Sequence, residues 1–160
     1  MTVSDRGSRG EREDKSGQVL FERLESQGFE VCCQTVVPDE CDQIRATLID
    51  LADTQKVPLI LTTGGTGVAP RDVTPEATLS VLDRAVPGMA EAMRAAGLAH
   101  TPHAMLSRAV AGQRGHCIIV NLSGSPKAVR EQLGALLPAL PHALETVTGI
   151  PRDCAPAPKP

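Results

Sequence analysis

The spacing of apolar residues predicts helices and strands that alternate along most of the chain. The predicted strands are the short apolar runs at residues 29–37, 57–63 and 116–122. The predicted helices are residues 15–27, a segment after Asp39, residues 74 to 84 or 85, a segment through Met89, Met93 and Leu98, and a long stretch after Ser125-Pro126 that is kinked or divided near Pro138 and Pro141. Strands and helices that alternate at this spacing indicate βαβ units, and therefore an α/β fold with a largely parallel sheet covered on both faces.

Helix-capping residues indicate where several of these helices begin and end. Asp14 is a typical N-cap residue for the first helix, and Gly28 follows that helix as a C′ residue. Thr74-Pro75 indicates the start of the third helix, because proline is favoured at the first helical position. Asp39 comes directly after the strand that stops at a proline, so it is placed to cap the second helix.

The two ends of the chain differ from its middle. Residues 1–4 have the composition of the end of a strand but are too few to make a complete one. Residues 5–14 are polar and contain glycine, which predicts a loop. Four prolines among the last ten residues predict that residues 150–160 are a disordered tail behind one domain of residues 1–149.

Charge and hydropathy exclude several classes of partner. The chain has 16 basic and 19 acidic residues, a net charge of −3, so no broad positive field is available to hold a nucleic-acid backbone. No apolar run reaches the roughly 18 residues of a membrane span, and the N-terminus is polar and charged. These features predict a cytoplasmic protein that binds neither nucleic acid nor membrane.

The cysteines, histidines and aromatic residues narrow the chemistry further. The five cysteines form an odd set without a C-x-x-C pair and the four histidines are scattered, which argues against a disulfide framework or structural zinc. Cys32 and Cys33 are adjacent in a predicted strand, so one is expected in the core and the other partly exposed. Phe21 and Phe29 are the only aromatic residues, so stacking of bases on rings is nearly excluded.

A glycine-rich turn follows the central predicted strand and is the sharpest local signal. Residues 57–63 lead into Gly64-Gly65-Thr66-Gly67, and Thr63 and Thr66 add hydroxyl groups. Ligands collect at the carboxyl ends of strands in open α/β sheets, where glycine lets backbone amides approach a phosphate. The turn matches neither a Walker A loop nor a dinucleotide fingerprint, so the alternatives are an anion site and a plain tight turn.

Two acidic residues are placed near the same edge. Asp72 follows Arg71 shortly after the glycine turn, and Asp39 ends the preceding strand. Two carboxylates beside a phosphate favour a bound divalent cation, because they would otherwise repel the nucleotide. The alternatives are a surface ion pair for Arg71-Asp72 and an ordinary helix cap for Asp39.

A second strand-to-helix junction has similar features. Ser123, Gly124 and Ser125 form a turn of small residues after the last predicted strand, and Lys127 lies in the first turn of the following helix. Free amides at a helix N-terminus together with a lysine favour a second phosphate site. An ordinary Ser-Pro helix start explains the same residues.

Ordered motifs along nearly the whole chain resemble the molybdopterin adenylyltransferases. They are Ser4-Asp5-Arg6, Asp14-Lys15-Ser16-Gly17, Val37-Pro38-Asp39-Glu40, the segment from Thr62 to Thr78, Val86-Pro87-Gly88-Met89, Leu106-Ser107-Arg108, the segment from Asn121 to Val129, and the segment from Leu137 to Leu144. Several motifs in the same order rarely coincide by chance, so together they identify a family that no single one could.

The resemblance implies a three-layer α/β/α fold with a mixed sheet, a homotrimer, and ATP with Mg²⁺ and molybdopterin at the site. It also implies that Asp39 and Asp72 are functional aspartates that hold the metal or the nucleotide, and that the product passes to the molybdate-inserting enzyme. The residues implied to bind substrate are Asp5, Asp14, Ser16, Thr63, Gly64, Gly65, Thr66, Gly67, Arg71, Ser123, Gly124, Ser125 and Lys127.

Three other readings remain open at this point. The first is a module of the same fold that binds molybdopterin without adenylyl transfer. The second is the molybdate-inserting enzyme, which normally has additional domains that 160 residues do not accommodate. The third is a nucleotide-sugar or pyrophosphate hydrolase, which would turn over without a pterin.

Overall fold

The computed structural model describes residues 1–149 and contains one sheet of six strands. The strand order is β2-β1-β3-β6-β5-β4; β2, β1, β3 and β6 are parallel, and β5 and β4 are antiparallel to their neighbours. The strands are β1 (Thr2–Val3), β2 (Val36–Val37), β3 (Leu59–Thr63), β4 (Arg84–Ala85), β5 (Ala111–Arg114) and β6 (Cys117–Leu122). The mixed, mostly parallel sheet confirms the predicted fold class.

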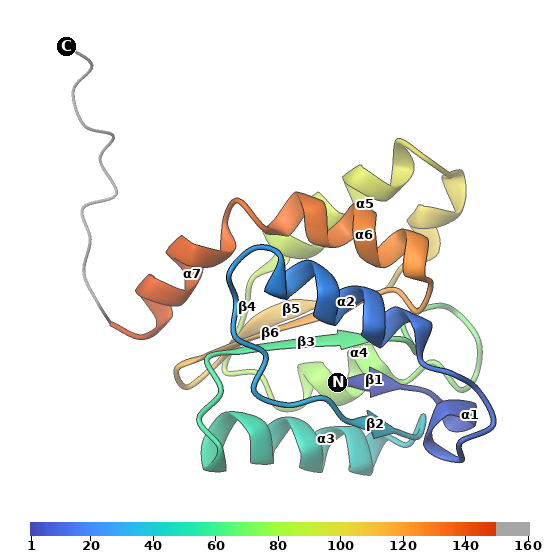
Figure 1. Ribbon diagram of the computed structural model, residues 1–160, viewed down its shortest axis with the longest axis horizontal. Coiled ribbons are helices and arrows are strands. Elements are labelled where there is room, and N and C mark those ends of the chain that lie inside the picture. Colours follow the sequence, from blue (N-terminus) through green and yellow to red (C-terminus); the bar gives the residue numbers. More distant parts are fainter. Residues whose placement is uncertain (150–160) are drawn as a thin grey trace.

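Helices cover the sheet on both faces and complete three layers (Figure 1). The helices are α1 (Asp5–Ser8), α2 (Lys15–Glu25), α3 (Cys41–Ile49), α4 (Thr74–Leu79), α5 (Pro87–Leu98), α6 (Pro126–Leu136) and α7 (Leu140–Val147), with a π-helical turn η1 (Asp50–Thr54) and a 3₁₀ turn η2 (Pro102–Leu106). One apolar core joins α2, α5, α6 and α7 to the sheet, and a second core joins α3 and α4 to its other face. β3 and β6 contribute to both cores because successive side chains of a strand point to opposite faces.

Several helix boundaries agree with the capping residues of the sequence. The Asp14 side chain accepts a hydrogen bond from the Gly17 amide at the start of α2, as predicted. The helix predicted from Thr74 does begin there, and the C-terminal stretch is divided between Leu136 and Leu140, near Pro138. The proposed disordered tail of residues 150–160 lies outside the described residues.

The predicted strand of residues 29–37 is mostly wrong. Only Val36 and Val37 pair with β1, which itself has just two residues, and residues 30–35 have no regular secondary structure. Cys32 and Cys33 are consequently both exposed, and neither enters the core as predicted.

Two further predictions need correction, and one strand was not predicted. Residues 5–14 are not entirely loop, because Ser4 caps the short helix α1 by accepting a hydrogen bond from the Gly7 amide. α4 ends at Leu79, and Arg84–Ala85 form β4 instead of continuing that helix, because they pair with β5. β5 itself was not predicted, since Ala111–Arg114 lacks the β-branched residues typical of strands and forms through pairing with β6.

The sheet places three predicted site segments together. β1, β3 and β6 run parallel and adjacent, so their carboxyl ends meet at one edge. This edge carries the turns that follow Val3, Thr63 and Leu122. Ligand sites of open α/β sheets form at such an edge.

Candidate functional site

A cavity of about 330 Å³ lies at this edge of the sheet. It is lined by the ends of β1 and β3 and by the first residues of α2 and α6. The predicted site residues that line it are Asp14, Ser16, Asp39, Thr63, Gly64, Gly65, Asp72 and Gly124. Asp39 and Asp72 therefore open onto the same cavity. The sequence places both residues near one edge of the sheet, and the two positions agree.

Gly64 and Gly65 form the floor of the cavity in a conformation that favours glycine. Their φ angles are +102° and +62°. The Thr74 hydroxyl donates to the Gly64 carbonyl at 2.9 Å, and the Thr74 amide donates to the Gly65 carbonyl at 3.1 Å. The Gly64 amide donates to the Leu122 carbonyl, so it is not available to a phosphate as the sequence had suggested.

The two strand-to-helix junctions are tied to each other through Thr63. Its hydroxyl donates to the Ser123 carbonyl at 2.8 Å, and its side chain is fully buried. Thr63 therefore has a structural role at the wall of the cavity. Thr66 is also buried, and its carbonyl accepts from the Arg108 amide.

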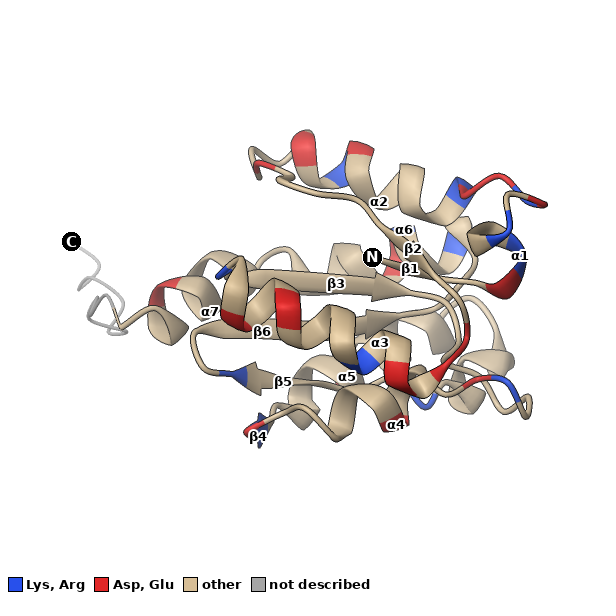
Figure 2. Ribbon diagram, turned by 90° about the horizontal axis from the view of Figure 1, so that it is seen from below, with Lys and Arg blue, Asp and Glu red and all other residues tan. Residues whose placement is uncertain are grey.

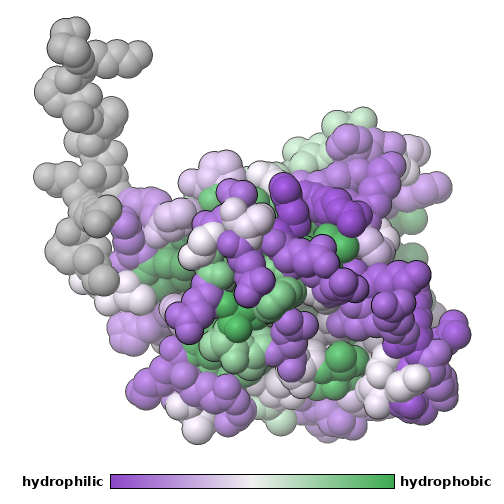
Figure 3. All heavy atoms as spheres, in the orientation of Figure 1, coloured by the Kyte–Doolittle hydropathy of each residue, from purple (hydrophilic) through white to green (hydrophobic). Residues whose placement is uncertain are grey.

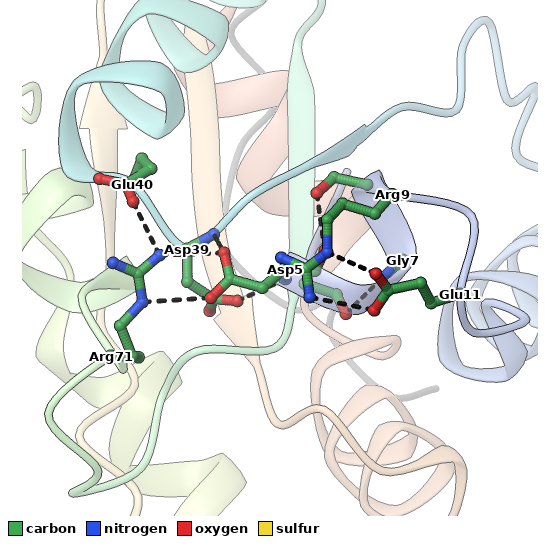
Figure 4. Close-up of polar contacts among 9 residues, drawn as sticks. Asp5, Gly7, Arg9, Glu11, Asp39, Glu40 and Arg71 are labelled. Atoms are coloured by element: carbon green, nitrogen blue, oxygen red, sulfur yellow. Dashed lines mark hydrogen bonds and ion pairs between the residues drawn. The ribbon is translucent and has the colours of Figure 1, made fainter.

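Asp39 and Asp5 hold each other in place through reciprocal hydrogen bonds (Figure 4). The Asp5 amide donates to Asp39 Oδ2 at 2.7 Å, and the Asp39 amide donates to Asp5 Oδ1 at 3.0 Å. Asp39 thus does not cap α3; the N-cap residue is Glu40, which makes no side-chain capping bond. Burial raises the pKa of the Asp39 carboxyl, and the negative charges of Asp5 and Asp72 add to this effect.

Arg71 is bound to two carboxylates in this structure (Figure 4). Its guanidinium donates to Asp5 at 3.0 and 3.1 Å and to Glu40 at 2.8 Å. The hydrogen bond from Arg71 lowers the pKa of Asp5. Arg71 therefore neutralises Asp5 and Glu40 beside the cavity, and neither Arg71 nor Asp5 lines it.

The loop that carries Asp72 is held from outside by Arg108. The Arg108 side chain donates to the carbonyls of Gly67 and Asp72 and to the Glu76 carboxylate. Asp72 Oδ2 accepts from the Ala69 amide at 2.9 Å, which closes the loop on itself. Sequence reasoning assigned no role to Arg108, although it stands in one of the motifs that carry the family resemblance.

The second predicted phosphate turn reaches the cavity only in part. Gly124 and Pro126 line it, whereas Ser123 exchanges hydrogen bonds with the buried Gln132 side chain. Ser125 caps α6 by accepting from the Ala128 amide. Lys127 is 75% exposed, lies 3.9 Å from Glu131, and does not line the cavity.

Two cations that sequence reasoning did not select line the cavity instead. Arg12 and Lys15 come from the segment around the start of α2. Figure 2 shows blue and red segments mixed around α1 and the start of α2. Because both basic and acidic side chains line the cavity, an anion can bind there next to the carboxylates.

The carboxylates of Asp39 and Asp72 fit a magnesium ion whose other ligands come from a bound phosphate and water. Asp39 and Asp72 each use Oδ2 to accept a backbone amide, and among the described residues Oδ1 of each has no protein donor. No group of three or more His, Cys, Asp or Glu within residues 1–149 forms a complete metal site. Mg²⁺ in proteins typically takes one or two carboxylates, substrate phosphates and waters, and Asp39 and Asp72 are the carboxylates of such a set in this cavity.

Comparison with known proteins identifies the family of the chain and agrees with the fold. The family described as "Probable molybdopterin binding domain" matches residues 1–142. The molybdopterin adenylyltransferase of Helicobacter pylori J99 is 42% identical over 93% of this chain and 86% of its own length. That of Escherichia coli K12 is 46% identical over 83% of this chain and 69% of its own length.

Solved structures give the same result. The molybdopterin biosynthesis enzyme MoaB from Thermus thermophilus superposes with a TM-score of 0.88 at 57% identity and covers 94% of both chains. The molybdopterin biosynthesis Mog protein from Mycobacterium ulcerans superposes with a TM-score of 0.86 at 42% identity, over 91% of this chain and 95% of that one. The chain therefore belongs to the molybdopterin-binding family of molybdenum cofactor biosynthesis, which includes the molybdopterin adenylyltransferases.

Proposed function

We propose that the protein is a molybdopterin adenylyltransferase, a nucleotidyltransferase. A terminal phosphate oxygen of molybdopterin attacks the α-phosphorus of ATP, the bond from that phosphorus to the bridging α–β oxygen breaks, and pyrophosphate leaves with the electron pair. The products are adenylylated molybdopterin and pyrophosphate. The observation that supports this most directly is the shared opening of Asp39 and Asp72 onto the cavity beside Gly65.

The residues of the cavity would act mainly by positioning and by balancing charge, as phosphoryl transfer requires. Gly64 and Gly65 let the chain turn without side chains, so phosphates can approach the backbone closely. Arg12 and Lys15 would bind the polyphosphate, while Ser16 and Asp14 line the same cavity and would contact the substrates there. Asp39 and Asp72 would hold the metal.

Magnesium, when bound, would supply positive charge to the triphosphate and polarise its phosphoryl oxygens. Asp39 is suited to this because Asp5 and the protein backbone fix the orientation of its carboxylate. Asp72 is suited to it because the Ala69 amide and Arg108 fix its loop. Asp5 and Arg71 would support Asp39 from outside the cavity.

The test is pyrophosphate release by the purified protein with ATP, Mg²⁺ and molybdopterin. We expect Asp72→Asn to lower kcat by about 100-fold or more, because one charge that holds the metal is lost. Asp42→Asn is the matched control, since the Asp42 side chain is 95% exposed and lies away from the cavity lining. Transfer by Asp72→Asn at the unmutated rate would remove the role proposed for this carboxylate.

The same assay separates the enzyme from the binding module of the same fold. A module would bind molybdopterin and ATP without releasing pyrophosphate. A hydrolase would release phosphate or pyrophosphate without any pterin. The enzyme proposed here requires both substrates for turnover.

Arg12 provides a second test of how the triphosphate is bound. We expect Arg12→Ala to raise the KM for ATP about fivefold with a smaller change in kcat, because a partly solvated charge contributes about 1 kcal/mol. Lys127→Ala removes a cation that does not line the cavity and should leave KM unchanged. Equal effects of the two substitutions on KM would contradict the assignment of Arg12.

The assembly and cellular context remain predictions. Within residues 1–149 no helix is long and apolar enough to cross a bilayer. We propose a homotrimer located in the cytoplasm that passes adenylylated molybdopterin to the molybdate-inserting enzyme. These proposals rest on the family to which the chain belongs.

A further inference from the structure

A glutamine side chain is buried beside the second strand-to-helix junction. Gln132 is 3% exposed and belongs to the buried face of α6, together with Val129, Leu133 and Leu136. Hydrophilic side chains gather on the surface over α1 and the start of α2 (Figure 3), whereas the Gln132 amide is turned into the protein. Burial of an amide group costs free energy unless its polar atoms are hydrogen-bonded, so the partners of Gln132 indicate its role.

Both polar atoms of the Gln132 amide bind Ser123. The Ser123 backbone amide donates to Gln132 Oε1 at 2.8 Å, and Gln132 Nε2 donates to the Ser123 hydroxyl at 2.9 Å. The Ser123 carbonyl accepts from the hydroxyl of the fully buried Thr63 at 2.8 Å. Each polar group of Ser123 thus has a partner inside the protein, and the residue is held by α6 on one side and by the end of β3 on the other.

The turn that Ser123 begins forms part of the wall of the cavity at the sheet edge. Gly124 and Pro126 line this cavity, as do Thr63 and Gly64 of the glycine turn. A Cβ atom at Gly124 would lie 3.2 Å from the Gly64 Cα, so the two turns already pack closely. A shift of Ser123 would therefore push Gly124 against Gly64 or away from it, and would change the shape of the cavity between the two junctions.

We propose that Gln132 is a positioning residue of the candidate site. Its amide fixes Ser123, and through Ser123 it sets the position of Gly124 and of the first turn of α6 beside the cavity. Gln132 does not line the cavity, so it acts through Ser123 and not by contact with a substrate. The effect on activity rests on the proposed function, whereas the effect on the turn does not.

The aspartates of the cavity are held by other contacts. Asp39 accepts from the Asp5 amide, and Asp72 accepts from the Ala69 amide. Neither of these contacts involves the junction before α6. Loss of the Gln132 amide should therefore weaken substrate binding while the carboxylates keep their positions. This expectation separates Gln132 in kinetics from Asp39 and Asp72, whose replacement should act on kcat.

Amide hydrogen exchange tests the structural step. Gln132→Met keeps a long unbranched side chain in the core but removes both hydrogen-bonding atoms of the amide. We expect the Ser123 amide to exchange about tenfold faster in this variant, with exchange in the middle of β6 unchanged. The matched control is Leu133→Met, which places the same residue at the next buried position of α6 and should leave the Ser123 amide protected. Unchanged exchange of the Ser123 amide in Gln132→Met would overturn the proposal.

Steady-state kinetics in the pyrophosphate assay tests the effect on the site. We expect Gln132→Met to raise the KM of ATP or of molybdopterin about tenfold with kcat within about twofold, and Leu133→Met to leave both constants unchanged. A residue that only stabilises the fold would lower the active fraction, and so the apparent kcat, without a change in either KM, and that result would overturn the proposal. If the unmutated protein releases no pyrophosphate, the proposed function fails, and the exchange experiment alone decides whether Gln132 holds the turn.

Two further variants keep the proposal testable if Gln132→Met does not fold. Ser123→Ala removes only the hydroxyl, so we expect about threefold faster exchange of the amide of residue 123 and about a threefold higher KM, and no change in either would overturn the proposal. Gln132→Glu keeps an acceptor for the Ser123 amide, and its second oxygen can accept from the Ser123 hydroxyl. Both quantities should therefore stay within about threefold of the unmutated values. A change of about tenfold in either for Gln132→Glu would contradict the proposal, because the hydrogen bonds that it requires are present in this variant.

Discussion

Gly64→Ala is expected to lower the free energy of unfolding by about 3 kcal/mol or more. Two effects add at this position. The φ angle of +102° is strained for any residue with a Cβ atom. An alanine Cβ would also overlap the Val3 carbonyl oxygen, which is part of the backbone and cannot rotate away.

The reason that this oxygen cannot move is the sheet itself. Val3 pairs with Val37, and Ser4 donates its amide to the Val37 carbonyl at 2.8 Å. Relief of the overlap would therefore displace β1 and the segment that leads to Asp5. The expected result includes loss of the reciprocal contacts of Asp5 and Asp39, and with them loss of activity.

Urea unfolding of Gly64→Ala and Gly134→Ala would measure this effect. Gly134 lies in α6 with open space around its Cβ position, so alanine there should stabilise the protein by about 0.5–1 kcal/mol. Opposite signs for the two variants are expected. A Gly64→Ala protein with the unmutated urea midpoint would show that the turn can rearrange freely, and that its conformation does not shape the cavity.

The features that could be predicted from sequence are those that depend on neighbours along the chain. The Gly64-Gly65 turn follows a buried apolar strand, and Asp14 precedes a helical pattern, so both were recognisable locally. The parallel sheet then follows from the alternation of elements. That alternation also brings Asp39 and Asp72 to one edge, which the structure confirms.

The features that could not be predicted depend on partners far away in sequence. Ala111–Arg114 has no strand pattern of its own and pairs with β6. Arg108 contacts Gly67 and Asp72 across about 40 positions of the chain, and no local rule selects such partners. Arg71 was correctly placed near the site, but its pairing with Asp5 and Glu40 is visible only in the folded protein.

Asp39→Asn is expected to abolish most of the activity and, at pH 7, to increase stability. The side-chain oxygen of an asparagine can still accept the hydrogen bond from the Asp5 amide. The backbone amide of residue 39 can still donate to the Asp5 carboxylate. It removes a charge that burial and the nearby Asp5 and Asp72 carboxylates disfavour. The loss of the charge that holds the metal should lower kcat about 100-fold or more.

The pH dependence follows from the raised pKa of Asp39. In the folded protein the pKa of this carboxyl lies above its ordinary value of 3.8, so its ionisation costs stability as the pH rises from about 3.8 through the folded-state pKa. Above that window the cost is constant, and below it the cost disappears. The stability gain of Asp39→Asn should therefore be full at pH 7 and shrink as the pH falls toward 3.8.

Asp5→Asn is the informative control because the pKa of Asp5 is lowered, whereas the pKa of the neighbouring Asp39 is raised. The hydrogen bond and charge of Arg71 lower the pKa of Asp5, so its ionised form stabilises the fold and its replacement should reduce stability at pH 7. Urea midpoints of the two variants, measured between pH 4 and pH 7, would test this difference in sign. Two carboxylates that hold each other through backbone amides would then have separate roles. Asp5 would support the structure, and Asp39 would be kept at a cost in stability because the reaction needs its charge.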